Sequence, residues 1–340
     1  MKTHIIVSKS AGPEWAGWHE HFQGNVYHSI DWAETRLLVH SDPLYFHWRD
    51  DNNTCLGIAV GIERRSPARY LGRFFKRLDF ETYPAAQDNN VELIRSMIRQ
   101  LADFAKEGGY GSLTIASFGS PVMVPDMDRL GFVTTPRREF ILDLTIPEGE
   151  LWRRLSEHHR RKIKKAGKHG LLFGEACTMD AMSQVRKLHE NSRERRLKRG
   201  EKLGMQADEA SFMAMGKNYF NKGLGRIFFM THENRVVTAA FVSVFAGKAI
   251  YVYGGSSQEG FQIDAPALSF WKIFSRCRDL GCKEFNLGGV PASSKNPEDQ
   301  AHGLYRFKAG FGGREVACLS GEAENLRPLL GTLQNAVKRG

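Results

Sequence analysis

What this sequence lacks narrows its class before any motif is considered. Of its 340 residues only five are cysteines; none forms a Cys-x-x-Cys pair, and none has a histidine beside it at metal-ligand spacing. We therefore expect reduced, mostly buried thiols in a cytosolic protein, with no metal site. The five are Cys55, Cys177, Cys277, Cys282 and Cys318.

Long apolar runs are also missing. The first residues, Met1 to Ile5, lack the apolar run of a signal peptide. The most apolar stretch, residues 238–254, is interrupted by Gly247 and Lys248 and is too short to span a bilayer. We expect a cytoplasmic protein without a transmembrane segment, which leaves peripheral membrane contact open.

Several familiar catalytic arrangements are absent as well. The sequence contains no P-loop and no pattern typical of a Ser/His/Asp or Cys/His triad. His158 and His159 are adjacent, so on a helix they point to different sides. Among enzymes, this leaves chemistry that depends on positioning and charge stabilisation without a covalent intermediate.

What the sequence does have is positive charge in two places. Lys and Arg number 48 against 38 Asp and Glu, a net charge of +10. Residues 153–168 hold eight Lys and Arg with one acid, and residues 186–202 hold eight with three acids. The rest of the chain is close to neutral. A localised excess of this kind indicates an anionic partner: nucleic acid, a phosphate or a membrane surface.

The hydrophobic spacing predicts a mixed α/β (α+β) fold. We expect helices at 91–106, 151–169, 181–196, 208–221 and 264–280, and strands at 58–63, 112–117, 140–144, 226–231, 236–245, 249–254 and 283–287. Turns at Glu233-Asn234 and Gly247-Lys248 would make three of these strands antiparallel neighbours. Pro147 and Gly149 punctuate a linker, which predicts domains 1–147 and 148–340.

The two halves contain an echo of each other. Residues 104–115 and residues 276–287 both read as a helix end, a glycine stop and a strand. Two copies of one design would explain this, and so would the general similarity of α/β units.

Each of the two basic stretches has a functional interpretation and a purely structural one. In residues 151–169 the cations surround an apolar stripe, and like charges this dense repel one another. An anion-binding helix would account for them, as would a solvated face. The second stretch reads either as a mobile loop over a site or as a helix end.

Two glycine-rich segments follow. Asn286 is succeeded by Leu287, Gly288 and Gly289 after a strand, where a ligand could approach the backbone closely. Residues 303–313 combine glycines with aromatic and cationic side chains, a mixture that suits a phosphate or a developing oxyanion in a glycine-rich turn. An ordinary tight turn is the alternative in both cases.

Four segments, in order, resemble signatures of the FemAB-type aminoacyltransferases and the BioF-like GNAT acetyltransferases. They are Leu151–Gly170, with its Arg-x-x-Ile-Lys-Lys-Ala core, Tyr251–Ser256, Phe285–Gly289 and Leu304–Gly312. The resemblance implies two tandem GNAT-like domains, of which the second carries the motifs. It also implies an acyl- or aminoacyl-transferase that acts on a cell-envelope precursor, either a peptidoglycan stem peptide or a polysaccharide.

The resemblance further implies roles for residues of this sequence. The Phe307-Lys308 pair matches a family pair whose lysine lies near the reacting centre, so we expect Lys308 to stabilise the leaving group or the oxyanion. The expected substrate-binding residues are Arg160, Arg161, Lys164, Lys165, Tyr253, Asn286, Gly288, Gly289, Tyr305, Arg306 and Phe307. Arg160 and the other cations of its helix would hold a phosphate, and Tyr253, Asn286 and the two glycines would line a cleft between the domains.

Departures from the family leave the donor open. The family often has Asp where this sequence has Asn286, and the usual acyl-CoA loop of GNAT enzymes is not found. No cofactor is expected to stay bound, and the acyl donor is either acyl-CoA or an aminoacyl-tRNA. Asp264, Glu284 and His302 are candidate general bases. The alternatives are acetyl-CoA-dependent acetylation in exopolysaccharide synthesis and a non-catalytic protein that binds an anion or RNA.

Overall fold

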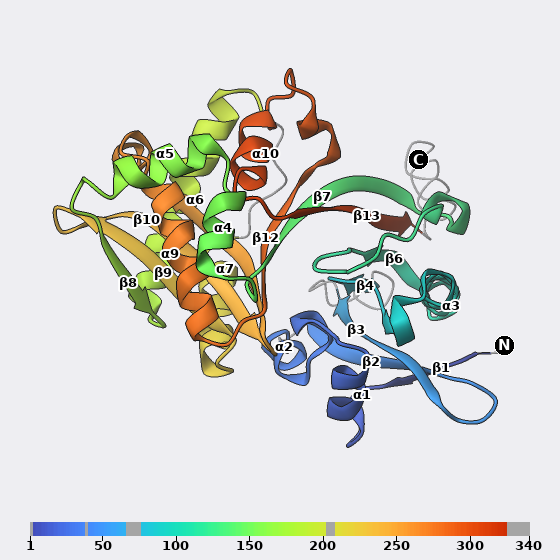
Figure 1. Ribbon diagram of the computed structural model, residues 1–340. Coiled ribbons are helices and arrows are strands. Elements are labelled where there is room, and N and C mark those ends of the chain that lie inside the picture. The colour runs from blue at the N-terminus through green and yellow to red at the C-terminus, as the bar shows by residue number, and fades with distance from the viewer. Residues whose placement is uncertain (1–2, 38–39, 66–75, 202–207, 325–340) are drawn as a thin grey trace, which may run out of the picture. The chain divides into compact units, whose positions relative to one another are not determined.

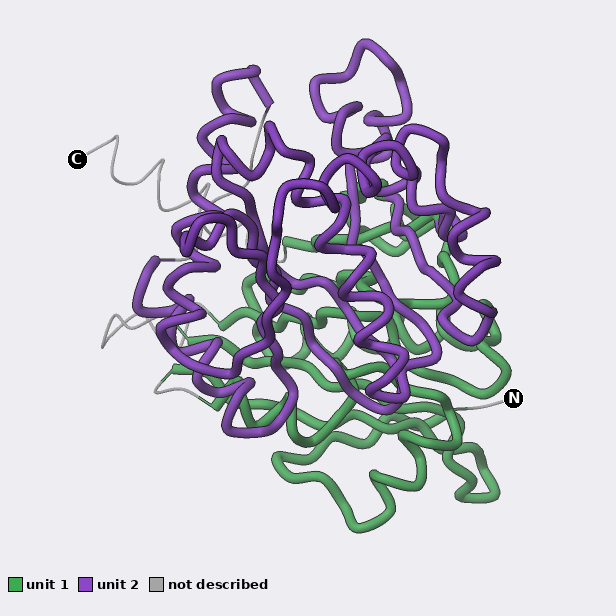
Figure 2. The backbone as a smooth tube through the Cα atoms, turned by 60° about the vertical axis from the view of Figure 1, so that its left-hand side comes forward, with its two compact units in different colours: residues 1–137, 317–340 green, residues 138–316 purple. Residues whose placement is uncertain are grey.

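The computed structural model describes residues 3–37, 40–65, 76–201 and 208–324. The chain forms two compact units, residues 1–137 with 317–340 and residues 138–316 (Figure 2). It enters the second unit within strand β7 (Val133–Asp143) and leaves it within β13 (Arg314–Glu324). The domains 1–147 and 148–340 stay predictions; the first compact unit differs from them by including the C-terminal strand.

The first unit is built on a sheet. Its strand order is β1-β2-β3-β4-β6 followed by the end of β13. The new strands are β1 (His4–Ser8), β2 (Ser41–Arg49), β3 (Cys55–Arg65), β4 (Lys76–Phe80) and β6 (Tyr110–Ile115), with the short β5 (Ala85–Ala86) paired to β3. The helices are α1 (Trp15–His21), α2 (Ile30–Thr35) and α3 (Val91–Glu107).

Helix α3 connects β4 to β6, which pair in parallel. Asn90 caps it by accepting a hydrogen bond from the Leu93 backbone N–H, and Gly109, at φ +68°, turns the chain into β6. One face of α3 is buried against aromatic and aliphatic side chains of the sheet. Its buried residues are Ile94, Met97, Ile98, Leu101 and Ala105.

The second unit also carries a sheet, in the order β7-β12-β11-β10-β9-β8 (Figure 1). Its strands are β8 (Leu172–Ala176), β9 (Gly225–His232), β10 (Arg235–Phe245), β11 (Lys248–Ser256) and β12 (Glu284–Pro291). β8, β9, β10 and β11 pair antiparallel in sequence, while β11 and β12 are parallel. Helix α9 (Ala265–Asp279) connects the parallel pair, as α3 does in the first unit.

Helices cover both faces of this second sheet. On one face α4 (Glu148–Arg154), α5 (Glu157–Ala166) and α9 share a core with Ala240 and Val242 of β10. Side chains alternate between faces along a strand. Phe241 accordingly meets Tyr219 of α7 (Glu209–Asn221), with ring centroids 5.5 Å apart. Helix α6 (Met179–Lys198) lies against β11, where any side chain at Gly255 would collide with the Leu188 carbonyl. The unit is completed by α8 (Gln258–Gln262) and α10 (His302–Ala309).

The structure confirms the α/β class, the three antiparallel strands and the echo between the halves. Each half contains two parallel strands joined by a helix that ends at a left-handed glycine, Gly109 or Gly281. This recurrence is what two copies of one design would produce.

Three local predictions are wrong. The helix expected at 151–169 is two helices, because Leu155 is extended and Ser156 starts α5 by accepting a hydrogen bond from the His159 backbone N–H. The turn between β10 and β11, expected at Gly247-Lys248, lies at Ala246-Gly247, because both of these residues adopt positive φ and Lys248 already lies in β11. The glycine-rich segment 303–313 is largely helix α10 rather than a turn.

Candidate active site

Lys308 lies where two parallel strands part. The pairing of β11 with β12 stops at Ile250 opposite Asn286, although the strands continue to Ser256 and Pro291. Lys308, on α10, has a buried side chain whose Nζ donates a hydrogen bond to the Gly289 carbonyl at 3.0 Å. Its ammonium also lies 5.9 Å from the centre of the Tyr251 ring. Tyr251 of β11 and Gly289 of β12, which lie beyond the last paired residues of these strands, therefore both contact one buried cation.

Glycine is needed at position 288 of this site. Gly288 has φ +74°, a conformation that side chains rarely adopt. A Cβ there would lie at ordinary contact distance, 3.5 Å from the Lys308 Nζ and 3.4 Å from the Tyr251 carbonyl oxygen, so the backbone conformation and not a clash calls for glycine. The left-handed turn at Gly288 is followed by Gly289, whose carbonyl accepts the hydrogen bond from the Lys308 ammonium.

Asn286 is buried beside these glycines. Its Oδ1 accepts a hydrogen bond from the Gly288 N–H at 2.7 Å, and its Nδ2 donates to Glu139 Oε2 at 2.7 Å. Sequence analysis did not select Glu139, because a single acid before an apolar strand carries no motif. The structure brings this carboxylate, Asn286, Gly288, Gly289 and Lys308 into one cluster.

The aromatic residues of the motifs divide between site and core. Tyr251 lies in one of the motifs but was not among the expected site residues, and its ring contacts Lys308. Tyr253, which was expected in the site, packs against His189 and Phe212. Burial raises the pKa of Tyr251, so its hydroxyl stays neutral. Phe307 packs against other rings of the core, including Phe270 at 5.7 Å.

Tyr305 and Arg306, the other expected site residues of α10, differ in burial: the Tyr305 ring packs against the core residue Phe140, with ring centroids 5.6 Å apart. The Tyr305 hydroxyl donates to Glu315 at 3.0 Å, and both burial and that carboxylate raise the pKa of Tyr305. Arg306 is exposed. The structure places neither residue against the Lys308 ammonium through a contact of its own.

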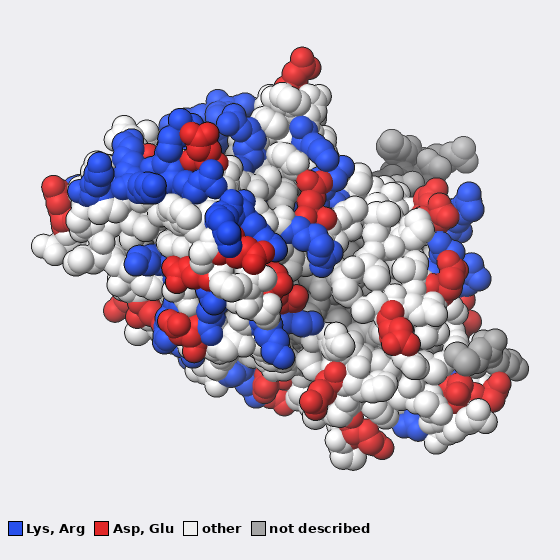
Figure 3. Space-filling view, viewed as in Figure 1, with Lys and Arg blue, Asp and Glu red and all other residues white. Residues whose placement is uncertain are grey.

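A basic surface gathers on the second unit. Lys and Arg side chains cover α5 in the space-filling view (Figure 3). Among the selected cations, Arg161 and Lys164 are exposed, and Arg161 lies 3.7 Å from Glu157. Arg160 donates to the carbonyls of Arg153 and Leu155, so it holds the end of α4 in place. The second basic stretch lies mostly in α6 and is not a loop there; residues 202–207 lie outside the described part.

Asp264 neutralises part of this basic surface. Its carboxylate lies 3.1 Å from both the Lys162 and the Lys165 ammonium groups. Burial alone would raise the pKa of Asp264, but these two lysines outweigh burial and hold that pKa below its ordinary value. Lys165, a selected phosphate ligand, is therefore already paired with an internal anion.

The candidate bases have other contacts. Asp264 makes the ion pairs just described, and His302 shares a hydrogen bond of 3.0 Å with the Ser294 carbonyl. Glu284 lies at the start of β12 and lines a cavity of about 500 Å³. That cavity is lined by residues of the second unit alone, among them Arg154, Lys248 and Lys283. None of the selected site residues lines it.

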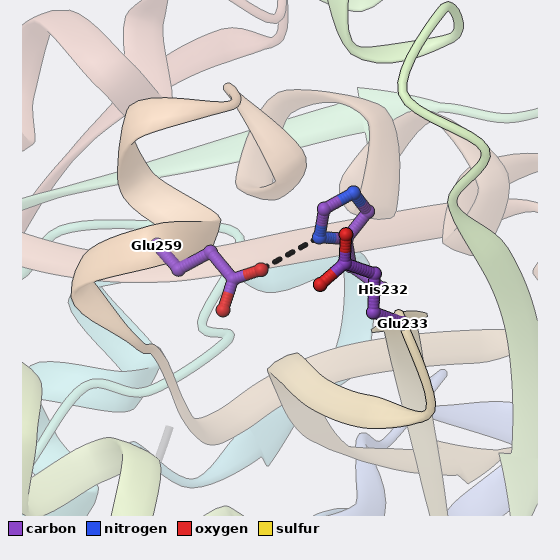
Figure 4. A group of neighbouring side chains, drawn as sticks. All are labelled: His232, Glu233 and Glu259. Atoms are coloured by element: carbon purple, nitrogen blue, oxygen red, sulfur yellow. Dashed lines mark hydrogen bonds and ion pairs between the residues drawn. The ribbon is translucent and has the colours of Figure 1, made fainter.

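One group of described residues has the composition of a metal site. His232, Glu233 and Glu259 hold their ligand atoms within 4.8 Å of one another (Figure 4). Arg235 lies 3.1 Å from Glu259 and 3.3 Å from Glu233. Because Arg235 pairs with both carboxylates and the His232 ring lies 2.6 Å from Glu259, the group is accounted for by contacts among these four side chains.

Comparison with known proteins bears on the resemblance. Residues 224–329 match the model of the FemAB family, and three of the four motifs lie inside that segment. The FemAB resemblance is confirmed. This FemAB-like protein is, as expected, a transferase. No curated protein matches the sequence.

Several solved structures have folds similar to that of this chain. FemX is 14% identical over 98% of this chain and 99% of its own, with a TM-score of 0.70. L-PGS from Bacillus licheniformis is 13% identical over 98% of this chain and 97% of its own, with a TM-score of 0.51. A tandem GNAT protein from the clavulanic acid biosynthesis pathway is 9% identical over 95% and 99%, with a TM-score of 0.54. At these identities the likeness establishes the tandem fold.

Among the described residues, no helix is both long and apolar enough to cross a bilayer.

Proposed function

We propose that this protein transfers an aminoacyl or acyl group onto an amine or hydroxyl of a cell-envelope precursor, and that it does so in the cytoplasm. The observation that carries the proposal is the buried Lys308 ammonium, held beside Gly288 and Gly289 where β11 and β12 part. The match to the FemAB family model over 224–329 supports the transferase class.

The chemistry follows from this cation. The acceptor nitrogen or oxygen attacks the donor carbonyl, which forms a tetrahedral oxyanion. The donor C–O or C–S bond then breaks while the new amide or ester bond remains, and the leaving hydroxyl or thiol takes the proton that the acceptor gives up. A fixed ammonium next to the developing negative charge lowers the barrier, and one such donor contributes about 10²–10³ in rate.

The donor carries a phosphate in either form. An aminoacyl-tRNA and an acyl-CoA would both be attracted by the exposed cations of α5, such as Arg161 and Lys164. We favour an aminoacyl donor because the resemblance implies that FemAB-type enzymes use aminoacyl-tRNA, and because the acyl-CoA loop of GNAT enzymes is missing from the sequence.

A transfer assay with two donors tests the proposal. The purified protein is incubated with [¹⁴C]aminoacyl-tRNA or with [¹⁴C]acetyl-CoA, and with a UDP-linked peptidoglycan stem-peptide precursor as acceptor. Transfer of label from the tRNA to the acceptor supports an aminoacyltransferase. Transfer from acetyl-CoA alone would show that the donor is acetyl-CoA and not an aminoacyl-tRNA. Salt-sensitive tRNA binding without any transfer would favour the non-catalytic alternative and overturn the proposal.

A further inference from the structure

Glu139 is a buried carboxylate that the proposed mechanism does not use. It lies on β7 with a relative exposure of 1%. A carboxylate removed from water needs partners, since burying an isolated charge is costly. One of its partners is Asn286, itself 4% exposed, whose Nδ2 lies 2.7 Å from Glu139 Oε2.

This contact fixes the direction in which the Asn286 amide points. An ionised carboxylate only accepts hydrogen bonds, and the backbone N–H of Gly288 only donates. Asn286 therefore satisfies both neighbours in one orientation, with Nδ2 towards Glu139 and Oδ1 towards the Gly288 nitrogen, which lies 2.7 Å away. A flipped amide would lose both hydrogen bonds.

The fixed amide in turn holds the backbone that receives Lys308. Asn286 Oδ1 restrains Gly288 in its left-handed conformation at φ +74°. The next residue, Gly289, offers the carbonyl to which the Lys308 ammonium donates at 3.0 Å. A continuous series of contacts thus leads from Glu139 through Asn286 and the glycine pair to Lys308.

We propose that Glu139 is a positioning residue for Lys308, which acts through the Asn286 amide and the Gly288–Gly289 backbone. The proposal rests on the function proposed for Lys308. It assigns a role to a residue on a different strand from the motifs, and it states that a negative charge, not only a hydrogen-bond acceptor, is needed at this point.

Exchanging the two side-chain types gives the sharpest test. Glu139→Gln keeps the volume and removes the charge, and kcat for label transfer should fall about tenfold while the donor KM is unchanged, because a hydrogen bond to a charged group is stronger than a neutral one. Asn286→Asp places two carboxylates at hydrogen-bond distance, so one must take up a proton and activity should shift to lower pH.

The exchanged pair Glu139→Gln with Asn286→Asp should recover most of the lost rate at neutral pH. In that double variant the introduced glutamine amide would donate to the introduced aspartate carboxylate, which could still accept from the Gly288 N–H. A merely structural contact would not show this pattern of loss, pH shift and recovery. An unchanged kcat in Glu139→Gln would overturn the proposal, and so would a double variant no faster than Asn286→Asp alone. If Asn286→Asp does not fold, the near-isosteric Glu139→Gln still decides.

A cycle with Lys308→Ala separates this proposal from the proposed function. If Glu139 acts through Lys308, Glu139→Gln should cause no further loss of kcat in the Lys308→Ala background. A wild-type rate in Lys308→Ala would refute the proposed function itself. A slow Lys308→Ala in which Glu139→Gln costs a further tenfold would refute the positioning role alone.

Discussion

Gly310 provides a test of the packing that carries Lys308. It ends α10 with an ordinary helical backbone, so alanine meets no backbone strain there. An added Cβ would lie 2.2 Å from His159 Cε1 and 2.3 Å from His159 Nδ1, far inside normal contact. The His159 ring is 2% exposed and lies 4.5 Å from the Phe311 ring, so it has little room to move.

The expected cost follows from two opposing effects. Overpacking a core costs about 1–3 kcal/mol, and replacing glycine by alanine in a helix returns about 0.5–1 kcal/mol. Gly310→Ala should therefore lower the free energy of unfolding by about 1–2 kcal/mol. For a unit of this size that lowers the melting temperature by roughly 3–6 °C. The kcat for transfer should fall too, because α10 also carries Lys308.

Gly303 is the matched control on the same helix. A Cβ at Gly303 meets nothing within 4 Å, so Gly303→Ala should be neutral or slightly stabilising and should keep its activity. Thermal unfolding followed by circular dichroism measures both variants. If Gly310→Ala melts at the same temperature as Gly303→Ala, then α10 does not pack on His159 as described, and the placement of Lys308 loses its support.

Two further predictions concern charge. Burial, aided by His158 and Lys162, lowers the pKa of His159 from 6.5 to about 4, so the unfolded chain binds this proton first. The stability that a neutral His159 contributes is therefore complete above pH 6.5 and is lost as the pH falls towards 4. The free energy of unfolding in urea should fall between pH 7 and pH 4.5 by roughly 2–3 kcal/mol more in wild type than in His159→Gln. Asp264→Asn should release Lys162 and Lys165 from their ion pairs and so tighten the salt-sensitive binding of bulk tRNA. The control Glu157→Gln removes the same charge from an exposed pair and should tighten this binding less. Equal effects of the two substitutions would mean that only net charge matters.

The sequence predicted those elements in which a local signal was strong. The stripe of apolar residues in 91–106 became α3, and the strand segments expected at 226–231, 236–245 and 249–254 became β9, β10 and β11. The break at Ser156 was missed because the apolar spacing continues through it, whereas the serine side chain caps a new helix. Segment 303–313 was interpreted as a turn from its glycines, yet Gly303 and Gly310 fit a helix without strain.

The site was predictable in its motifs and not in its partners. The Phe307-Lys308 and Gly288-Gly289 pairs lie in recognisable segments, and the structure brings Lys308 to the glycines. Glu139 is far from them in sequence and reaches Asn286 only because β7 and β12 are neighbours in the sheet. Asp264, which stays a candidate base, pairs with Lys162 and Lys165 of α5, a contact between distant segments that no local pattern encodes.

The central claim is that the buried Lys308 ammonium stabilises charge during transfer, and single-turnover kinetics of Lys308→Ala test it most directly. The control is Lys272→Ala, which removes an exposed cation from α9 of the same unit and lies outside the proposed site. We predict that the transfer rate of Lys308→Ala falls by about 10²–10³ with donor binding unchanged, while Lys272→Ala keeps a rate close to wild type. Transfer by folded Lys308→Ala at the wild-type rate would contradict the claim.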